Sequence, residues 1–363
     1  MNIIHACNRY YPDFGGSESH VQNISEKMVE LGHQVQVYTT DPSGSLPPLE
    51  EINGVGVHRF KSIAPNDSFF FSTKLYQSLK NTNCDIVHGH DLNGFPLLAA
   101  TISKGTNKLF GTLHVGCASS KIRALIRLPY NGIVMHNLLK KADKIICVSE
   151  YERIKFEQIL KLPSDKFVVI PNGYNLKFPL EKAWVKGSRT ILSVGRLERA
   201  KGFHFLLQSF ALIHKIEEFK DVEVVIVGKG PFEPHLKKQI LDLGLTESVH
   251  IYQDVPRSSL LDLYDKCSMF VLLSNYESAG LAVWDAFAYK KPTITSTAAV
   301  LGEYALKGYS IGVDLPPKSE ELATIIQNTL RNPEKYRAKE FKMLSWDQVA
   351  EKIISIYNQA LIQ

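Results

Sequence analysis

The chain has 363 residues, of which 44% are hydrophobic and 22% are charged. This balance is typical of a folded globular protein and excludes an intrinsically disordered chain. The length favours two domains of about 170 residues, and a formal net charge of +5 is too small to indicate a nucleic-acid partner.

The first half of the sequence alternates between short apolar runs and longer amphipathic stretches. Continuous apolar runs are typical of parallel strands that are buried on both faces. The expected strands cover residues 3–7, 34–40, 55–60, 85–90, 108–114, 144–149 and 167–171. Between the first two strands, Val21, Ile24, Met28 and Leu31 recur at helical spacing, which predicts a helix.

The second half repeats this alternation of strands and helices. The expected strands are 190–195, 222–228, 249–253, 269–274 and 292–296. The expected helices are 202–214, 232–243, 258–267, 281–289 and 320–330. Strands and helices in this rhythm predict an α/β fold with two doubly wound, Rossmann-like domains facing across a cleft. We place the domains at 1–173 and 189–345, a linker at 174–188 and a last helix at 346–363.

Two loops in this scheme carry residues that suit an anion. Ligands of doubly wound sheets bind beyond the carboxyl ends of the strands. Gly15 and Gly16 follow the first strand and precede a helix, so their amides can approach a phosphate, although a plain tight turn explains them too. Arg196 and Lys201 follow the first strand of the second half. They could clamp a diphosphate, and a solvated basic loop is the alternative.

A third segment combines two acids with a glycine. Glu277 follows an apolar strand, and Asp285 lies eight positions on, inside the next helix. Gly280 falls at the start of that helix, where free amides and the positive helix end can face a phosphate. A carboxylate in such a helix can hold the two hydroxyls of a ribose. Two ordinary acids, one exposed and one half-exposed, are the alternative reading.

In this order, the segments resemble glycosyltransferase family 4, a group of retaining enzymes with two Rossmann-like domains (the GT-B fold). The resemblance covers nearly the whole chain. The matching segments are 11–12, 15–16, 18, 20, 32–35, 85–91, 112–114, 142–143, 148–149, 170–173, 194–197, 201–202, 226–231 and 345–346. The resemblance implies an acceptor-binding first domain, a second domain that binds a nucleotide sugar, and a last helix that crosses back onto the first domain.

The resemblance also implies roles for the motif residues at the nucleotide. Gly15 and Gly16, together with Arg196 and Lys201, would hold the diphosphate. The two basic residues would also stabilise the leaving charge. The loop 254–257, which includes Val255, would form the pocket for the base.

The same resemblance assigns the remaining motif residues to the sugar and the ribose. Glu277 would lie near the donor sugar, His114 would hydrogen-bond one of its hydroxyls, and Asp285 would bind the ribose. The amides of Gly280 and Leu281 would touch the phosphate or the sugar.

The sequence departs from the family pattern at the donor-sugar end of the site. Asp285 stands where the family has glutamate, which keeps the charge but shortens the side chain by one methylene group. Ala279 and Ala282 stand where an aromatic residue and a proline are expected, and Lys290 replaces a small glycine.

The expected activity is therefore that of a metal-independent, retaining hexosyltransferase. It would move a sugar from a UDP- or GDP-linked donor to a glycan or lipid-linked acceptor in the synthesis of cell-surface glycans, polysaccharides or glycoproteins. No cofactor is expected beyond the donor. His88, His90 and Asp91 could be read as metal ligands, but the resemblance favours structural histidines. A non-catalytic nucleotide-sugar-binding protein and a sugar phosphorylase or epimerase on the same fold stay open as alternatives.

The segment 120–144 suggests a contact with lipid. It carries six basic residues and one acid, Asp143, among aliphatic side chains. Such a surface could rest on anionic lipid and meet a lipid-linked acceptor, whereas an ordinary solvated helix is the alternative. The five cysteines are scattered and form no CxxC pair, which fits a reducing compartment. We expect a cytoplasmic protein, at the inner face of the cell membrane where this segment touches lipid.

Overall fold

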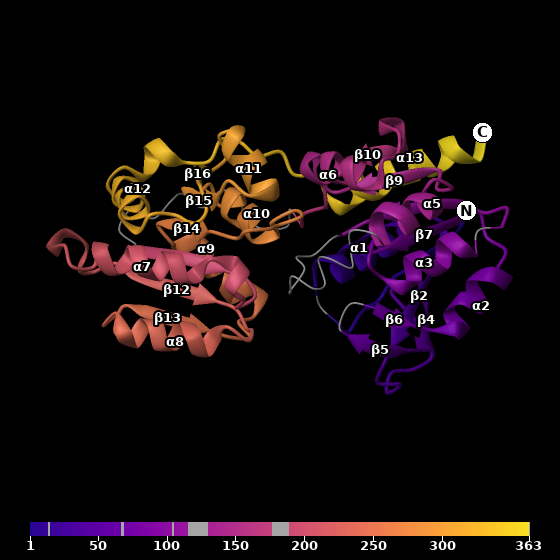
Figure 1. Cartoon of the computed structure of the whole chain (residues 1–363), viewed down its shortest axis with the longest axis horizontal. Coiled ribbons are helices and arrows are strands. Elements are labelled where there is room, and N and C mark those ends of the chain that lie inside the picture. The colour runs from indigo at the N-terminus through magenta and orange to yellow at the C-terminus, as the bar shows by residue number, and fades with distance from the viewer. Residues whose placement is uncertain (14, 67–68, 104, 115–129, 176–188, 363) are drawn as a thin grey trace. The chain divides into compact units, whose positions relative to one another are not determined.

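The computed structural model describes residues 1–13, 15–66, 69–103, 105–114, 130–175 and 189–362. The chain divides into two compact units (Figure 1). Unit 1 comprises Met1–Leu176 together with Met343–Gln363, and unit 2 comprises Lys177–Lys342. Most of the predicted linker at 174–188 lies outside the described residues, which end at 175 and resume at 189.

Unit 1 is built on a sheet with the strand order β10-β9-β8-β7-β1-β2-β4-β3. Its strands are β1 (Asn2–Ala6), β2 (Gln34–Asp41), β3 (Leu49–Ile52), β4 (Val55–Lys61), β7 (Ile86–His90), β8 (Lys108–Thr112), β9 (Lys144–Cys147) and β10 (Phe167–Val169). All neighbouring strands pair in parallel except β3 and β4. A separate antiparallel pair consists of β5 (Ile63–Asn66) and β6 (Phe69–Phe71). Because the chain order reverses between β1 and β7, the carboxyl ends of these two strands are the expected place for a ligand.

Both faces of the unit 1 sheet are buried. Successive residues of a strand point to opposite faces, and Ile3 and Ile4 accordingly belong to different cores. The Ile3 core is completed by α1 (Gly16–Glu30) and α13 (Trp346–Ile362). The Ile4 core is completed by α2 (Thr73–Asn81), α3 (Phe95–Ile102), α5 (His136–Leu139) and α6 (Glu150–Leu160). The last helix therefore packs on the first domain, as predicted.

Unit 2 has a fully parallel sheet with the strand order β13-β12-β11-β14-β15-β16. Its strands are β11 (Thr190–Val194), β12 (Glu223–Val227), β13 (Val249–Tyr252), β14 (Met269–Leu272), β15 (Thr293–Ser296) and β16 (Ile311–Val313). Its helices are α7 (Phe203–Ile213), α8 (Glu233–Asp242), α9 (Arg257–Lys266), α10 (Leu281–Ala288), α11 (Ala299–Leu306) and α12 (Ser319–Arg331). This is the strand order of the dinucleotide-binding Rossmann fold, and the direction of the strand order reverses between β11 and β14. The predicted class, two doubly wound α/β domains, is confirmed.

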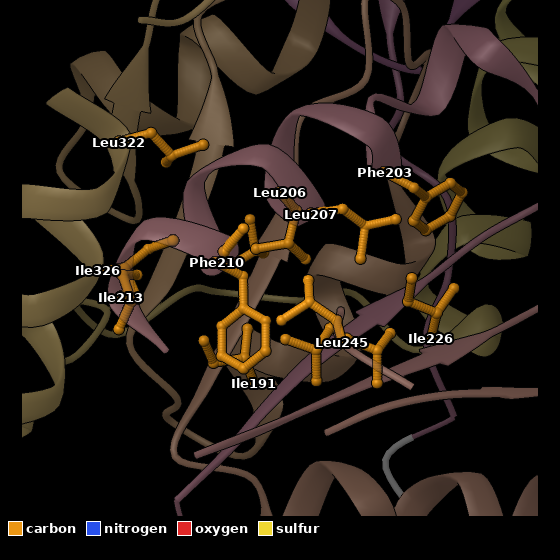
Figure 2. Close-up of a cluster of buried hydrophobic side chains, with 14 of the residues drawn as sticks. Ile191, Phe203, Leu206, Leu207, Phe210, Ile213, Ile226, Leu245, Leu322 and Ile326 are labelled. Carbon is orange, nitrogen blue, oxygen red and sulfur yellow. The ribbon is translucent and has the colours of Figure 1, made fainter. Parts of the chain in front are cut away.

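The core of unit 2 is centred on α7 (Figure 2). Phe203, Leu206, Phe210 and Ile213 repeat at helical spacing and are buried, so one apolar stripe of α7 faces the core. This stripe packs with Ile191 and Ile226 of the sheet and with Leu322 and Ile326 of α12. Truncating a fully buried phenylalanine such as Phe210 to alanine typically costs about 3–5 kcal/mol. The core thus fixes β11 and β12 beneath the loops that carry the motif residues.

Five short helical turns complete the described elements. They are η1 (Tyr130–Met135), η2 (Ser164–Lys166), η3 (Arg199–Lys201), η4 (Glu217–Phe219) and η5 (Pro333–Tyr336).

Candidate active site

The loops after β11 and β14 meet at the point where the strand order of unit 2 reverses. The Asn275 amide donates a hydrogen bond of 2.8 Å to the Ala200 carbonyl, which joins the two loops. Gly202, the residue just before α7, has a φ of +74°, and a Cβ atom at this position would clash with the Leu273 carbonyl. Glycine is therefore required for the close approach of the two loops.

Lys201 and Glu277, one from each of these loops, form an ion pair. Lys201 Nζ lies 2.5 Å from Glu277 Oε1, and the two side chains are 21% and 15% exposed. Partial burial strengthens such a pair relative to one in open water. The structure thus brings together two of the four residues predicted to be catalytic.

Arg196 lies in the loop after β11, and Val255, the residue predicted to line the base pocket, lies in the loop after β13. Arg196 has a side chain that is 70% exposed, and its Nε lies 3.0 Å from Glu198 Oε1. It is therefore placed at the strand exit, as predicted, but is paired with Glu198 rather than with Glu277. Val255 is half-buried in the loop between β13 and α9.

Gly280 caps the N-terminus of α10. Its φ of +67° is left-handed, which favours glycine, and Leu281 is the first residue of the helix. The loop before it is held by Tyr304 of α11, whose hydroxyl donates a 2.6 Å bond to the Ala279 carbonyl and accepts a 2.7 Å bond from Trp284 Nε1. Burial raises the pKa of Tyr304 above its ordinary value. The hydroxyl therefore stays protonated and keeps donating to the loop.

Asp285 pairs with Arg257, the first residue of α9. Arg257 Nη1 and Nη2 donate to Asp285 Oδ2 and Oδ1 at 2.6 and 2.5 Å. The Asp285 side chain is only 6% exposed, whereas that of Arg257 is 49% exposed. A bidentate hydrogen bond of this kind fixes the orientation of the carboxylate. Arg257 thus links the loop of Val255 to the residue predicted to bind the ribose.

In unit 1, the glycine pair lies against an acid. Gly16 is the first residue of α1, and Gly15 precedes it in an extended conformation. A Cβ atom on Gly15 would collide with the Glu18 carboxylate, and Ser17 Oγ donates to Glu18 Oε2 at 3.2 Å. The Glu18 carboxylate therefore lies at this helix end, and an anion that binds there must displace it.

Unit 1 also contains a cluster of five histidines, one of which is His114. They come from β1, α1, β7 and the residues after β8, and they are His5, His20, His88, His90 and His114. Burial lowers the pKa of His5 to about 3 and that of His20 to about 4. Burial, together with the neighbouring histidines, also lowers the pKa values of the other three. All five rings are therefore neutral at pH 7.

The members of this cluster are bonded unequally. His88 uses both ring nitrogens, towards the Tyr357 hydroxyl at 2.6 Å and Thr112 Oγ1 at 2.8 Å. This arrangement agrees with the structural role expected for it. In contrast, His90 Nδ1 and His114 Nε2 are buried without a hydrogen-bond partner among the described residues. An unsatisfied buried polar group typically costs about 1–3 kcal/mol.

Asp91 follows His90 at the end of β7. Burial, followed by the charge of Glu18, raises the pKa of Asp91 to about 7. Its backbone φ of +67° is in the left-handed region, as is that of His114 at +33°. Backbone strain of this kind tends to concentrate at functional sites.

Several of the contacts at this site were not predicted from the sequence. The Arg257 and Tyr304 contacts depend on the packing of α9 and α11, which no local motif encodes. A signal for the histidine cluster does exist, because His88 and His90 are two residues apart on a strand and therefore share a face. His5 pairs in register with His88 in the sheet, which sequence spacing alone does not reveal.

Much of the basic segment at 120–144 lies outside the described residues, which resume at 130. In its described part, Ile133 and Val134 are 64% and 41% exposed. Among the helices of the described chain, none has the length and apolar character that crossing a bilayer demands.

The chain matches two sequence families along most of its length. Residues 14–178 match Glycosyltransferase Family 4, and residues 177–340 match Glycosyl transferases group 1. An uncharacterized glycosyltransferase of Methanocaldococcus jannaschii is 25% identical over 96% of this chain and 95% of its own length. A subunit of the phosphatidylinositol N-acetylglucosaminyltransferase of Saccharomyces cerevisiae is 24% identical over 98% of this chain and 82% of its own length.

Solved structures share the fold at lower identity. Sucrose-phosphate synthase from Thermosynechococcus elongatus superposes with a TM-score of 0.78 at 18% identity, covering 99% of each chain. The Anabaena protein HepE, solved in complex with UDP-glucose, has a TM-score of 0.70 at 17% identity and covers 99% of this chain and 98% of its own. The two-unit α/β architecture, the ordered motifs and the family matches lead to one conclusion: the chain belongs to the family 4 glycosyltransferases and has the GT-B fold.

Proposed function

We propose that the protein is a retaining hexosyltransferase. It takes a sugar from a UDP- or GDP-linked donor and transfers it to a glycan or lipid-linked acceptor in the synthesis of cell-surface glycans or glycoproteins. The observation that carries this proposal is the meeting of Lys201, Glu277 and the N-terminus of α10 at the strand reversal of unit 2. Doubly wound sheets bind nucleotides at such a point.

The charges at this reversal suit a diphosphate leaving group. Lys201 and Arg196 supply two cations, and the amides of Gly280 and Leu281 lie at the positive end of α10. Positioned cations and amides stabilise developing negative charge without a metal ion. We therefore assign no metal to the transfer step. Glu277 would then lie beside the donor sugar, with its charge balanced by Lys201.

The nucleoside would occupy the neighbouring loops. Asp285 is oriented by Arg257, so its carboxylate could accept hydrogen bonds from the ribose hydroxyls. Val255 lies two residues before Arg257 and would contact the base. The UDP-glucose complex of HepE, a protein with the same fold, supports a nucleotide-sugar donor.

For the acceptor, we propose a lipid-linked or glycan chain that meets the protein at unit 1. The name of the yeast relative includes phosphatidylinositol as the acceptor, which supports a lipid-linked acceptor for this protein. The segment 120–144 would rest on an anionic membrane, and the exposed Ile133 and Val134 support this contact. Flotation with vesicles that contain anionic lipid tests it. Binding should weaken when Lys140 and Lys141 are changed to glutamate, and unchanged binding would contradict the contact.

The proposed activity can be tested by using proton NMR to monitor the turnover of the donor. Purified protein is incubated with UDP-glucose, UDP-N-acetylglucosamine, GDP-mannose and related donors, together with lipid and glycan acceptor extracts. The anomeric signal of the first product should have the configuration of the donor. An inverted product would refute retention, and an interconverted donor without transfer would favour an epimerase.

A matched pair of variants connects this assay to the site. Glu277→Gln should lower turnover at least tenfold. Glu218→Gln, which removes an acid paired with Arg331 elsewhere in unit 2, should not change it. If the parent binds a nucleotide but never turns over a donor with any acceptor, the non-catalytic alternative replaces the transferase.

A further inference from the structure

Lys229 and Asp254 form an ion pair between two neighbouring loops of unit 2. Lys229 lies in the loop after β12, Asp254 lies in the loop after β13, and these two strands pair in parallel. Lys229 Nζ and Asp254 Oδ2 are 3.4 Å apart. Because the carboxyl ends of parallel strands lie at one edge of the sheet, the pair belongs to the edge of unit 2 at which doubly wound sheets bind ligands.

The loop of Lys229 is held closely against the loop after β11. A Cβ atom on Gly228 would collide with the Gly195 carbonyl, and one on Gly230 would collide with the Leu197 carbonyl. The Leu197 amide also donates a hydrogen bond of 3.0 Å to the Lys229 carbonyl. Glycine on both sides therefore fixes the backbone from which the lysine side chain extends.

Asp254 has a backbone that few residue types adopt. Its φ of +48° is in the left-handed region, where aspartate and asparagine are more frequent than other side chains. The side chains of Lys229 and Asp254 are 69% and 74% exposed. Exposed ion pairs contribute little to stability, so a ligand can separate these two charges at little cost.

The position of the nucleobase rests here on the proposed function. In that proposal, the diphosphate binds at Lys201 and the ribose binds at Asp285, which is held by Arg257. Arg257 is the first residue of α9, and Asp254 lies in the short loop just before that helix. The base that extends from this ribose is therefore expected beside the Asp254 carboxylate.

The charges of this pair match the hydrogen-bonding edge of guanine. Guanine has two adjacent donors, N1–H and the N2 amino group, next to the acceptor O6. A carboxylate can accept from both donors, and a lysine ammonium can donate to O6. In uracil, N3–H stands between two carbonyl oxygens, which a carboxylate repels. In adenine, the amino group stands beside an acceptor nitrogen, which a carboxylate also repels.

We propose that Asp254 and Lys229 make the site selective for guanine, so that the donor is a GDP-linked sugar rather than a UDP-linked one. Asp254 accepts hydrogen bonds from N1–H and from the N2 amino group. Lys229 leaves the carboxylate and donates to O6. Val255, the neighbour of Asp254, contacts the base from the same loop.

Isothermal titration calorimetry of the full chain with nucleoside diphosphates provides the first test. The parent should bind GDP at least tenfold more tightly than UDP. Inosine diphosphate (IDP), which lacks the N2 amino group, should bind more weakly than GDP because one bond to Asp254 is lost. UDP or IDP bound as tightly as GDP would overturn the assignment.

Variants then assign the selectivity to the pair. Asp254→Asn should lower GDP affinity at least tenfold and reverse the preference between GDP and xanthosine diphosphate (XDP), because an amide can donate to the O2 carbonyl of xanthine. Asparagine also tolerates the left-handed backbone. Lys229→Met should weaken GDP and IDP equally, since both have O6. Asp242→Asn changes an exposed acid at the end of α8 and should bind like the parent.

The outcomes separate this assignment from the proposed function. An unchanged ratio of GDP to XDP affinity in Asp254→Asn would refute the role of Asp254. If the parent binds UDP more tightly than GDP, the guanine assignment fails and the nucleotide-sugar donor stands. If none of these nucleoside diphosphates binds, both fail.

Discussion

Lys201 Nζ lies 2.5 Å from Glu277 Oε1, so the loops that follow β11 and β14 are joined by a pair of opposite charges. These strands flank the reversal of strand order in unit 2. Each charge therefore has a partner before any nucleotide arrives. A diphosphate that binds here would share Lys201 with Glu277, which couples the binding of the phosphate to the position of the acid at the sugar.

Replacing Lys201 with methionine should weaken the binding of UDP or GDP by about 1–3 kcal/mol, because a charge-assisted hydrogen bond to the diphosphate is lost. Isothermal titration calorimetry with both nucleotides measures the change. Lys237→Met is the matched control, since Lys237 has a largely exposed side chain that pairs with Glu233 on α8. If the Lys201 variant binds both nucleotides as tightly as the control, Lys201 is not at the diphosphate.

The proposed hydrogen bond between Asp285 and the ribose can be tested with nucleotides that lack the 2′-hydroxyl. The parent should bind UDP or GDP more tightly than the corresponding 2′-deoxynucleotide, since Asp285 would accept a bond from the missing hydroxyl. In Asp285→Asn this preference should fall, because an amide oxygen accepts more weakly than a carboxylate. Asp285→Glu should keep or increase it. A preference that is unchanged in Asp285→Asn would assign the ribose to another residue.

Tyr304→Phe should destabilise unit 2 and loosen the loop before α10. The substitution leaves Trp284 Nε1 and the Ala279 carbonyl without a partner, at a cost of about 1–3 kcal/mol. Urea denaturation measures the loss, and nucleotide-sugar affinity should fall in parallel. Tyr309→Phe is the control, because Tyr309 packs on the same Phe287 and Phe341 rings. Equal effects of both substitutions would show that the Tyr304 hydroxyl does not hold the loop.

The buried Lys291 predicts a pH dependence of stability. Burial lowers its pKa below the ordinary value of 10.5, and its Nζ donates to the Asp265 carbonyl at 2.7 Å. Above the lowered pKa, the folded state binds fewer protons at this site than the unfolded state does. The free energy of unfolding therefore rises with pH in this range, up to about the ordinary pKa.

In Lys291→Met this contribution is absent. The parent should thus gain stability relative to the variant between about pH 7 and pH 9.5, as measured by urea denaturation at both values. Lys266→Met removes an exposed lysine at the end of α9 and should follow the parent. A parent that loses stability relative to Lys291→Met over this interval would reverse the predicted sign.

Most of the parallel strands of both units were predictable because they are largely buried and read as short apolar runs. β3 and β16 were not predicted, for a physical reason. Both are short strands at sheet edges, and β3 is Leu-Glu-Glu-Ile with half-buried or exposed residues. Edge strands need no continuous apolar sequence, so the hydrophobic pattern does not reveal them.

Within the site, the sequence places the motif residues just after the predicted strands. It does not show which residues form ion pairs or hydrogen bonds with them. Lys201 and Glu277 lie after strands that are neighbours in the sheet, which the predicted topology allows. The bidentate hydrogen bond from Arg257 to Asp285 joins residues 28 positions apart and depends on how α9 packs on α10. The contact of His20 with Asn172, 152 positions apart, similarly requires the packed structure.

The most direct test of the central claim is a thermal-shift panel with UDP, GDP, ADP and their common sugar conjugates. A ligand that binds only the native state raises the melting temperature by mass action. We predict a shift with one nucleoside diphosphate, larger with one of its sugars, and a smaller shift in Lys201→Met and Asp285→Asn. No shift with any of these ligands, or equal shifts in the parent and in both variants, would contradict a nucleotide-sugar site at the strand reversal of unit 2.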